Sequence, residues 1–421
     1  MIETPVATRT ANVTATEEKG ILENFLSTIP ESIFGPDRVR YIVENANKLD
    51  EQDKIVLRNF INKILTHMIE IDASDIEIGG HGNEGYIWMR IYGKKERVRE
   101  LQQFSEDEAA LIIINLFSEN QKEYLLKNRN IDFSYTYYYK TRKLNVRFRA
   151  DSYFDLDTLA LNMRLINLSI RPLESLEFHP LTVRSLSHNY IKFGLTLITG
   201  ITGSGKSTTL DSIIDHHNKF DPAHIIIIAS PIEYVHTSNI SLIKHREVGR
   251  DVLSFKDGIV QALRQDPDII VVGEMRDEET IMAALEVTDT GHKVFSTLHT
   301  SSATESLDRI IAEVHPIEQD RVRNRLADVL ICVVSQKLVP TLDGKRALVK
   351  EVLIVTPSVR AAIKNNNTSE IYMMINQGGA LGMITMEQDL KRLYMLKKIS
   401  LDTAITYANN KTRIQQILLV K

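Results

Sequence analysis

Between Gly200 and Thr208 the chain carries closely spaced glycine, lysine and hydroxyl residues that could bind phosphate. This segment contains the run GITGSGKS, which fits the phosphate-binding pattern G-x-x-x-x-G-K-[ST]. In that pattern the glycines let backbone N–H groups point at phosphates, the lysine reaches the β- and γ-phosphates, and the hydroxyl that follows completes the shell of a Mg²⁺ ion. The sequence therefore predicts that ATP and Mg²⁺ bind here, through Gly200, Thr202, Gly203, Ser204, Gly205, Lys206, Ser207 and Thr208, with Ser207 on the metal.

The segments on either side of this run are suited to position it. Leu195 to Ile198 is a short apolar run typical of a buried parallel strand, and Ser207 to His217 has helical periodicity. A glycine-rich turn without a ligand is the alternative. Because strand, loop and helix follow in the order that phosphate binding needs, we favour the nucleotide site.

Three later segments each bring polar residues to the end of an apolar, strand-like run. Glu233 follows 225–228, Glu274 follows 268–272, and His292 and His299 lie at the two ends of another run. Ligands of open α/β sheets bind at the carboxyl ends of the strands. We therefore expect these residues to belong to the same site.

Hydrolysis needs a carboxylate near the metal and another group that orients the attacking water. Glu274 is predicted to contact Mg²⁺ through water, and Glu233 to orient or deprotonate the attacking water, although both could be surface salt-bridge partners. His292 and His299 are predicted to sense phosphate by hydrogen bonds or to be structural. A zinc site is not favoured, because no third ligand has suitable spacing.

Composition narrows the function class only a little. The chain has 421 residues, 43% of them hydrophobic and 25% charged, with a formal net charge of −4. This length predicts two or three domains, and the absence of a basic surplus argues against a strong, unspecific nucleic-acid binder. The single cysteine, Cys332, allows neither an internal disulfide nor a four-cysteine zinc site, and we expect no membrane span and no signal peptide.

The pattern of apolar and polar residues divides the chain into regions with different predicted secondary structure. Residues 1–48 read as a weakly structured arm with short helices, and Glu51 to Ile71 carries one helical apolar stripe. Alternating apolar and polar residues over 75–78, 86–92, 131–139 and 143–150 predict half-buried antiparallel strands. Residues 173–187 look like a linker; from 191 strands alternate with helices, and after about 356 the pattern is helical.

Four motifs together resemble the secretion ATPases of type II and type IV systems. They are GITGSGKS, SPIEY, LRQDPDIIVVGEMRD and TGHKVFSTLHTSSA, which look like the Walker A, aspartate, Walker B and histidine boxes of that superfamily. The C-terminal stretch from Pro357 to Leu390 is similar to the type IV pilus retraction ATPases, the PilT/PilU type. The resemblance implies an ATP-hydrolysing, homohexameric motor that is cytoplasmic, peripheral at the inner membrane, and docks on a pilus platform protein.

The same resemblance implies an α/β fold of two domains. A PAS-like α+β domain over 49–172 would be joined by the linker 173–187 to a RecA-like P-loop core over 188–355, with a helical region over 356–421. It also implies that two arginines of the first domain reach a nucleotide of the ring as charge stabilisers. Arg149 and Arg164 match their spacing, and surface arginines on a strand pair are the alternative.

Two departures from the family pattern leave other functions open. Ala229 and Ser230 stand where the aspartate box usually has two carboxylates, and 358–365 keeps only Arg360 and Ile363 of the retraction signature. A type IVB secretion ATPase, or a low-activity accessory ring subunit that works with a paralogous pilus ATPase, are therefore alternatives. A nucleic-acid motor that uses Arg321, Arg323 and Arg325 is a further one, but a charged helix face is favoured for these arginines.

Overall fold

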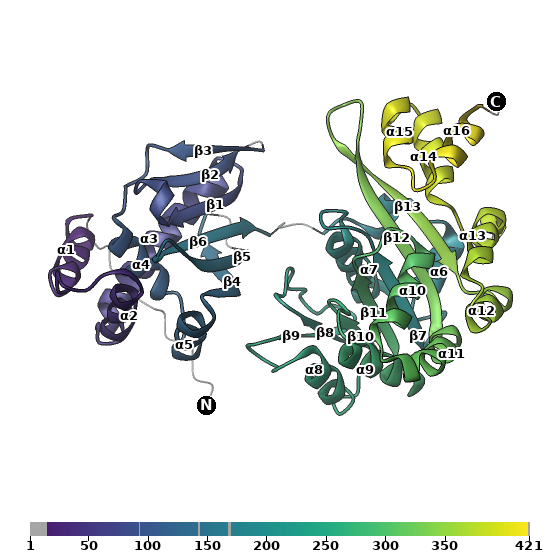
Figure 1. Ribbon diagram of the computed structural model, residues 1–421, viewed down its shortest axis with the longest axis horizontal. Coiled ribbons are helices and arrows are strands. Elements are labelled where there is room, and N and C mark those ends of the chain that lie inside the picture. Colours follow the sequence, from purple (N-terminus) through teal and green to yellow (C-terminus); the bar gives the residue numbers. More distant parts are fainter. Residues whose placement is uncertain (1–14, 92, 142–143, 167–169, 420–421) are drawn as a thin grey trace. The chain divides into compact units, whose positions relative to one another are not determined.

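The computed structural model describes residues 15–91, 93–141, 144–166 and 170–419 (Figure 1). The chain divides into two compact units, with the boundary between Ile166 and Asn167. We call them unit 1 and unit 2 and describe each by itself. The mixed α/β class that the sequence predicts is confirmed.

Unit 1 is built on a six-stranded antiparallel sheet of order β3-β2-β1-β6-β5-β4. One face of this sheet carries alternate apolar side chains, such as Ile76, Phe148 and Met163, which form a core with the helices. The strands are β1 (Ala73–Gly79), β2 (Ile87–Ile91), β3 (Lys94–Val98), β4 (Asn130–Tyr139), β5 (Leu144–Asp155) and β6 (Thr158–Leu165). The helices are α1 (Ala15–Leu26), α2 (Gly35–Ala46), α3 (Glu51–Glu70), η1 (His81–Asn83), α4 (Glu106–Ile114) and α5 (Glu119–Asn128).

The helix predicted from Glu51 to Ile71 is confirmed as α3. Asp50 caps its first turn by accepting a hydrogen bond from the backbone N–H of Asp53. The strands predicted from alternation are confirmed as β1, β2, β4 and β5, while Tyr92 and Lys143 lie outside the described residues.

In the N-terminal extension we expected a weakly structured arm with short helices, and its described part contains the helices α1 and α2. The apolar residues of these helices recur at helical spacing and are buried in the core of unit 1: Leu22, Phe25, Val39, Ile42, Val43 and Ala46. Ile29, between the two helices, is buried in the same core. Arg38 of α2 also pairs with Asp107 of α4, Nη2 to Oδ2 at 2.6 Å. Burial of these apolar faces makes both helices part of unit 1, and residues 1–14 lie outside the described range.

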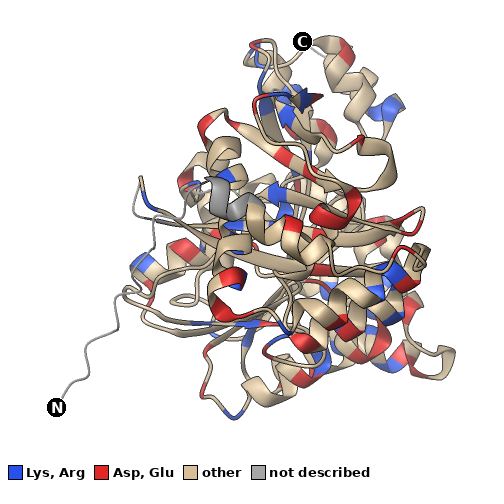
Figure 2. Ribbon diagram, turned by 90° about the vertical axis from the view of Figure 1, so that its left-hand side faces the viewer, with Lys and Arg blue, Asp and Glu red and all other residues tan. Residues whose placement is uncertain are grey.

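Charged side chains are interspersed along the ribbon, as the near balance of 51 basic and 55 acidic residues suggests (Figure 2). A few of them are buried, among them Asp75 in unit 1 and Lys293 in unit 2. A buried charge needs a close partner. Asp75 and Lys293 are therefore positions where hydrogen bonds or ion pairs hold polar groups in place.

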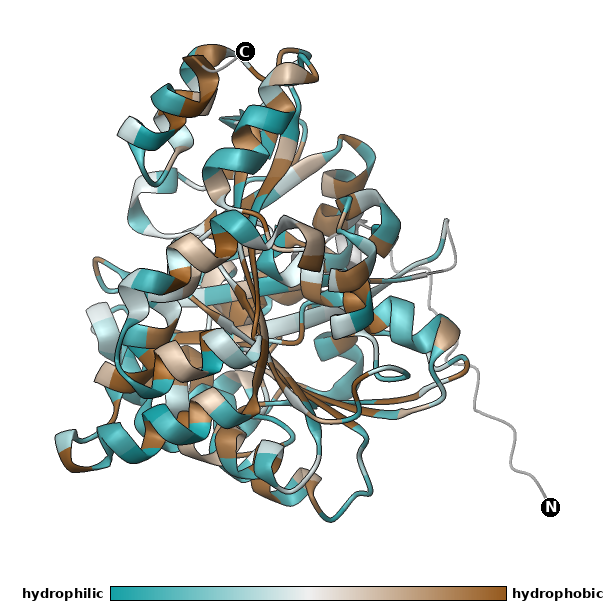
Figure 3. Ribbon diagram, turned by 90° about the vertical axis from the view of Figure 1, so that its right-hand side faces the viewer, coloured by the Kyte–Doolittle hydropathy of each residue, from teal (hydrophilic) through white to brown (hydrophobic). Residues whose placement is uncertain are grey.

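Unit 2 is built on a seven-stranded sheet of order β13-β12-β7-β11-β10-β8-β9, in which only β13 runs antiparallel to its neighbour. The central strands β7, β11, β10 and β8 are largely buried and lie between helices whose outer sides are hydrophilic (Figure 3). The strands are β7 (Gly194–Thr199), β8 (His224–Ala229), β9 (Leu242–Glu247), β10 (Ile269–Val272), β11 (Lys293–Leu298), β12 (Leu330–Pro340) and β13 (Arg346–Ile354).

The helices of unit 2 pack in three cores, one on each face of the sheet and a third where the C-terminal helices cover β12 and β13. They are η2 (Leu173–Leu176), α6 (Pro180–Leu186), α7 (Lys206–Phe220), α8 (Phe255–Ala262), α9 (Glu278–Asp289), α10 (Ala303–Glu313), η3 (Pro316–Glu318), α11 (Gln319–Val329), α12 (Pro357–Lys364), α13 (Thr368–Gln377), η4 (Gly378–Leu381), α14 (Met386–Met395), α15 (Leu401–Tyr407) and α16 (Lys411–Leu419). The last five α-helices follow the helical pattern expected after about residue 356.

The segment 173–187, which we expected to be a linker, forms η2 and α6. Leu173, Leu176 and Leu186 are buried in the core between α7 and the sheet. Because these leucines are covered by unit 2, the segment packs as part of that unit.

Candidate active site

Four parallel strands of unit 2 end side by side and carry the segments singled out in the sequence. The backbone N–H of Gly200, after β7, donates to the carbonyl of Leu298 at the end of β11, at 3.2 Å. The N–H of Gly273, after β10, donates to the carbonyl of Ile228 in β8, at 2.7 Å. The residues that follow β7, β8, β10 and β11 therefore meet at one edge of the sheet.

The glycine-rich loop joins β7 to α7 and has no room for a side chain at its first position. Gly200 has φ +152°, and a Cβ placed there would lie 2.4 Å from Ser204 Oγ and 2.5 Å from the carbonyl oxygen of Gln336. Gly205 caps α7 with φ 88° and offers no side chain to its first turn. The first N–H groups of α7 thus have no capping side chain, which fits a helix end that accepts an anion.

Gln336 of β12 supports this loop from behind, a contact that the sequence did not suggest. Its side chain is buried, and its Nε2 donates to the carbonyl of Ser204 at 2.8 Å. A hydrogen bond from a buried amide holds the loop backbone in place. No local sequence motif predicts this role for Gln336, because it is far from the loop in sequence and reaches it only through the pairing of β12 with β7.

Lys206 is the first residue of α7 and lies over the loop. Its Nζ donates to the carbonyls of Gly200 at 2.7 Å and Ile201 at 3.2 Å. Burial lowers the pKa of Lys206, while the carboxylates of Glu274 and Glu233 act in the opposite direction. The ammonium group therefore lies within electrostatic reach of both predicted catalytic carboxylates.

Glu274 follows β10 and is surrounded by basic groups. Its Oε2 lies 2.8 Å from Arg276 Nε and 3.7 Å from His299 Nε2. Burial lowers the pKa of His299, and the Lys206 ammonium lowers it further. The structure thus brings together Lys206, Glu274 and His299 and adds Arg276, which the sequence analysis did not assign.

The position before Glu274 is glycine because β8 and β10 approach closely there. A Cβ on Gly273 would lie 3.0 Å from the Cβ and 3.1 Å from the Cα of Ala229. A side chain at position 273 would therefore require Ala229 to move by a few tenths of an ångström. Glu274, one residue later, supplies the carboxylate at the end of this strand.

His292 is not brought to the site. It precedes β11, and its carbonyl accepts from the N–H of Gly194 at the start of β7, at 3.2 Å. Its Nδ1 lies 3.0 Å from Thr290 Oγ1. Because His292 and His299 lie at opposite ends of one strand, roughly 20 Å separates them, and His292 has a local structural contact instead.

Arg149 and Arg164 lie in unit 1, directly opposite each other on β5 and β6. Arg149 Nη2 is 3.9 Å from Asp132 Oδ1, and Arg164 Nε donates to Asp75 Oδ1 at 2.7 Å. Both guanidinium groups are more than half exposed. The strand pairing therefore places the two predicted charge stabilisers on one face of the sheet.

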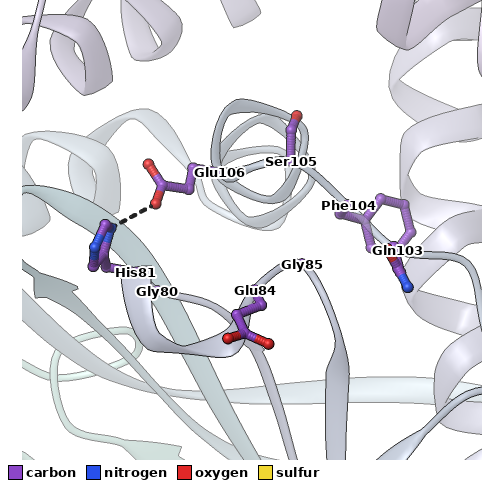
Figure 4. A pocket seen from close by; sticks show the side chains of 8 residues that line it. All are labelled: Gly80, His81, Glu84, Gly85, Gln103, Phe104, Ser105 and Glu106. Atoms are coloured by element: carbon purple, nitrogen blue, oxygen red, sulfur yellow. Dashed lines mark hydrogen bonds and ion pairs between the residues drawn. The ribbon is translucent and has the colours of Figure 1, made fainter.

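A pocket of about 330 Å³ lies elsewhere in unit 1, at the start of α4 (Figure 4). His81 Nδ1 and Glu106 Oε1 meet across it at 3.0 Å. None of the residues predicted to act on a nucleotide lines this pocket, so we assign it no part in the reaction.

Among the described residues no group of three or more His, Cys, Asp or Glu side chains is placed to hold a metal ion. Within the same residues no helix has both the length and the apolar character that a membrane crossing requires. Mg²⁺ in nucleotide sites is usually held by phosphates and one or two protein ligands, and Ser207 with Glu274 fits that smaller requirement.

Comparisons with known proteins give consistent matches. The family described as "Type II/IV secretion system protein" matches residues 50–417. A "Twitching motility protein" of Neisseria gonorrhoeae is 38% identical over 324 residues, which cover 76% of this chain and 84% of the relative. The "Type IV pilus ATPase PilU" of Pseudomonas aeruginosa is 32% identical over 349 residues, which cover 83% and 88%.

A solved structure matches across both units. The crystal structure of "the Pilus Retraction Motor PilT and Bound ADP" superposes with a TM-score of 0.75 and 34% identity, covering 85% of this chain and 99% of that one.

Proposed function

This chain belongs to the type II/IV secretion system protein family, and on that premise we propose that it is an ATP-hydrolysing motor that drives type IV pilus retraction. The observation that carries the proposal is that Lys206 donates to the carbonyls of the glycine-rich loop and lies within electrostatic reach of Glu274 and Glu233. We take the process, pilus retraction, from the names of the similar proteins, which refer to twitching motility and pilus retraction.

The chain's own residues would divide the chemistry of hydrolysis among them. Lys206 and the N–H groups at the start of α7 would bind the phosphates of ATP, and Ser207 and Glu274 would hold Mg²⁺. Mg²⁺ would supply positive charge to the phosphate oxygens. Glu233 would orient the attacking water and accept its proton, while His299 would contact phosphate by a hydrogen bond.

We propose that the working form is a homohexameric ring in which Arg149 and Arg164 stabilise charge on a nucleotide. Guanidinium groups suit this role because they stay protonated and bind phosphate oxygens in pairs. The ring would lie in the cytoplasm against the inner membrane and act on a pilus platform protein. In this proposal unit 1 is the PAS-like domain and unit 2 the RecA-like motor domain.

A second candidate is a low-activity accessory subunit of the same motor, beside a paralogous pilus ATPase. It is favoured by Ala229 and Ser230, which replace the carboxylates usual at this strand end, and it would bind ATP but hydrolyse it slowly. The similar proteins include one named as a PilU ATPase as well as one named as a PilT motor.

A motor on nucleic acid has less support. Arg321 pairs with Glu318 at 3.0 Å, Arg323 lies 3.8 Å from Asp320, and Arg325 pairs with Asp289. Because each guanidinium has a carboxylate beside it, the charge available to phosphates on α11 is reduced.

The deciding experiment measures ATP hydrolysis by the purified full chain and by Lys206→Ala, and tests both genes for restoring pilus retraction in cells that lack the native one. A motor requires hydrolysis that Lys206→Ala removes and retraction that only the native chain restores. Equal rates for the two proteins would support the accessory subunit, and stimulation by DNA or RNA would revive the nucleic-acid motor.

A further inference from the structure

Unit 1 carries a row of residues in register across all six strands of its sheet. From β3 to β4 the row is Lys95, Arg90, Asp75, Arg164, Arg149 and Ser134, each the direct partner of the next. Directly paired residues project to the same side of a sheet. The adjacent residues Ile76 and Met163 face the apolar core, so this basic row lies on the opposite face.

The row holds four cationic side chains and one anionic side chain. Like charges directly opposite each other destabilise a sheet, and Arg164 faces Arg149 without a carboxylate between them. Asp132 reaches Arg149 only at 3.9 Å. Lys95 pairs with Glu77, so Arg149 and Arg164 are the cations of the row best suited to a ligand that brings several negative oxygens at once, such as a polyphosphate.

Asp75 is the one carboxylate in the row and is held rigidly. Its side chain is only 7% exposed, while that of Arg164 is 67% exposed. Oδ1 accepts from Arg164 Nε at 2.7 Å, Oδ2 accepts from Ser74 Oγ at 2.7 Å, and Arg90 Nε lies 3.6 Å from Oδ2. Burial acts to raise the pKa of Asp75, but the Ser74 hydroxyl and the Arg164 guanidinium outweigh it and lower the pKa.

A buried, fixed carboxylate that binds the Nε side of an exposed arginine determines where the rest of that guanidinium points. We propose that Asp75 is a positioning residue that presents Arg164, with Arg90 beside it, to the triphosphate bound by a second copy of the chain. This inference rests on the proposed function, because the second copy and its nucleotide come from the proposed ring.

The test compares ATP hydrolysis by the full chain with that of Asp75→Asn, Arg164→Gln and the double variant. Asp75→Asn keeps the size of the side chain and removes its charge. We expect kcat to fall about 10-fold while KM for ATP changes by less than about 2-fold, because a misdirected arginine weakens stabilisation of the transition state more than substrate binding. In the Arg164→Gln background the same substitution should have no further effect.

Glu84→Gln is the matched control, since Glu84 is an exposed carboxylate of unit 1 that pairs with Arg97 at 3.1 Å, outside the row. It should leave kcat unchanged. Binding of a fluorescent ADP analogue and the thermal unfolding temperature, measured for every variant, separate a positioning role from damage to the fold. If Asp75→Asn does not fold, Ser74→Ala gives the same comparison, with an expected kcat loss of about 3-fold that is absent when Arg164 is already Gln.

Two results would overturn the inference: full kcat in Asp75→Asn, or an equal loss of kcat with and without Arg164. If the wild-type chain hydrolyses ATP and either result is found, the role of Asp75 is refuted and the proposed function is not. Absence of hydrolysis in the wild type, or unchanged hydrolysis in Lys206→Ala, refutes the proposed function instead.

Discussion

The ammonium group of Lys206 lies 2.7 Å from the carbonyl oxygen of Gly200, the first residue of the loop that it serves. The loop carbonyls thus hold the cation over the place where the site would take phosphate. A lysine held in this way loses little side-chain freedom when a phosphate arrives, which favours binding.

Lys206→Ala should abolish hydrolysis. Removing the cation takes away charge that follows the transferred phosphoryl group, so we expect kcat/KM to fall by about 100-fold or more. Lys219→Ala is a suitable control, because Lys219 lies at the far end of the same helix and pairs with Asp215. A steady-state ATPase assay decides, and an active Lys206→Ala enzyme would contradict the assignment of the site.

Gly200→Ala should damage the loop. The added methyl would meet Ser204 Oγ at 2.4 Å and the carbonyl oxygen of Gln336 at 2.5 Å. We expect a loss of about 1–3 kcal/mol in stability together with weaker nucleotide binding, measured by thermal unfolding and by titration with a fluorescent ADP analogue. Gly82→Ala has open space around its new methyl and should change neither quantity.

Arg276→Gln should reduce the Mg²⁺ concentration that half-maximal nucleotide binding requires. Arg276 Nε lies 2.8 Å from Glu274 Oε2, so the arginine competes with the metal for that carboxylate. Its side chain is exposed, and such pairs contribute about 0.2–1 kcal/mol, which predicts a shift of up to about 5-fold.

The measurement for Arg276 is a Mg²⁺ titration of ADP-analogue fluorescence. Arg309→Gln is the control, since Arg309 pairs with Glu313 instead. A requirement for more Mg²⁺ in Arg276→Gln would mean that this arginine assists the site rather than competing in it.

Acid should destabilise unit 2 through His217. The N–H of His188 donates to Nε2 of His217 at 3.2 Å, and Nδ1 lies 2.7 Å from the carbonyl of Ile213, so the neutral ring satisfies both contacts. Burial lowers the pKa of His217 from 6.5 to about 4. Since the unfolded chain binds the proton more tightly, the contribution is complete above pH 6.5 and is lost as the pH falls towards 4.

The loss amounts to about 3 kcal/mol at most. Calorimetric unfolding of the full chain at pH 7.5 and pH 5 measures the part lost by pH 5, which is about 2 kcal/mol. His217→Gln should flatten this pH dependence, while substitution of the exposed His315 by Gln should not. An unchanged pH dependence in His217→Gln would show that other groups cause the acid sensitivity.

Ile42→Ala should destabilise unit 1, although Ile42 lies before the part of the chain that matches the family. Its side chain is completely buried, so truncation should cost about 2–5 kcal/mol. The single tryptophan, Trp88, lies in β2, and its fluorescence therefore follows the unfolding of unit 1 in urea. Ile55→Ala, at a half-exposed position of α3, should have little effect.

Much of unit 2 could be predicted from local pattern. The glycine spacing of 200–205, the apolar runs before Glu233 and Glu274, and the helical periodicity after Lys206 are all features of short segments. Short-range rules of backbone and side-chain periodicity suffice for these, because strand, loop and helix are adjacent in the chain. The same rules placed His292 and His299 at the two ends of one strand, and the geometry keeps only His299 at the site.

These short-range rules could not predict which residues are buried against parts of the chain that are far away in sequence. Short helices were expected within residues 1–48, but only packing against the core of unit 1 shows that α1 and α2 belong to it. Likewise Leu173, Leu176 and Leu186 are covered by strands far along the chain, which is why 173–187 packs with unit 2.

Local sequence patterns were enough to predict the glycine-rich loop, the carboxylates that follow the parallel strands, and the α/β class. Three contacts appear only in the folded chain: Gln336 supports the loop, Ala229 crowds position 273, and Asp75 holds Arg164. The reason is that these contacts join residues from different strands, and strand order and register depend on the packing of the whole sheet rather than on any single segment.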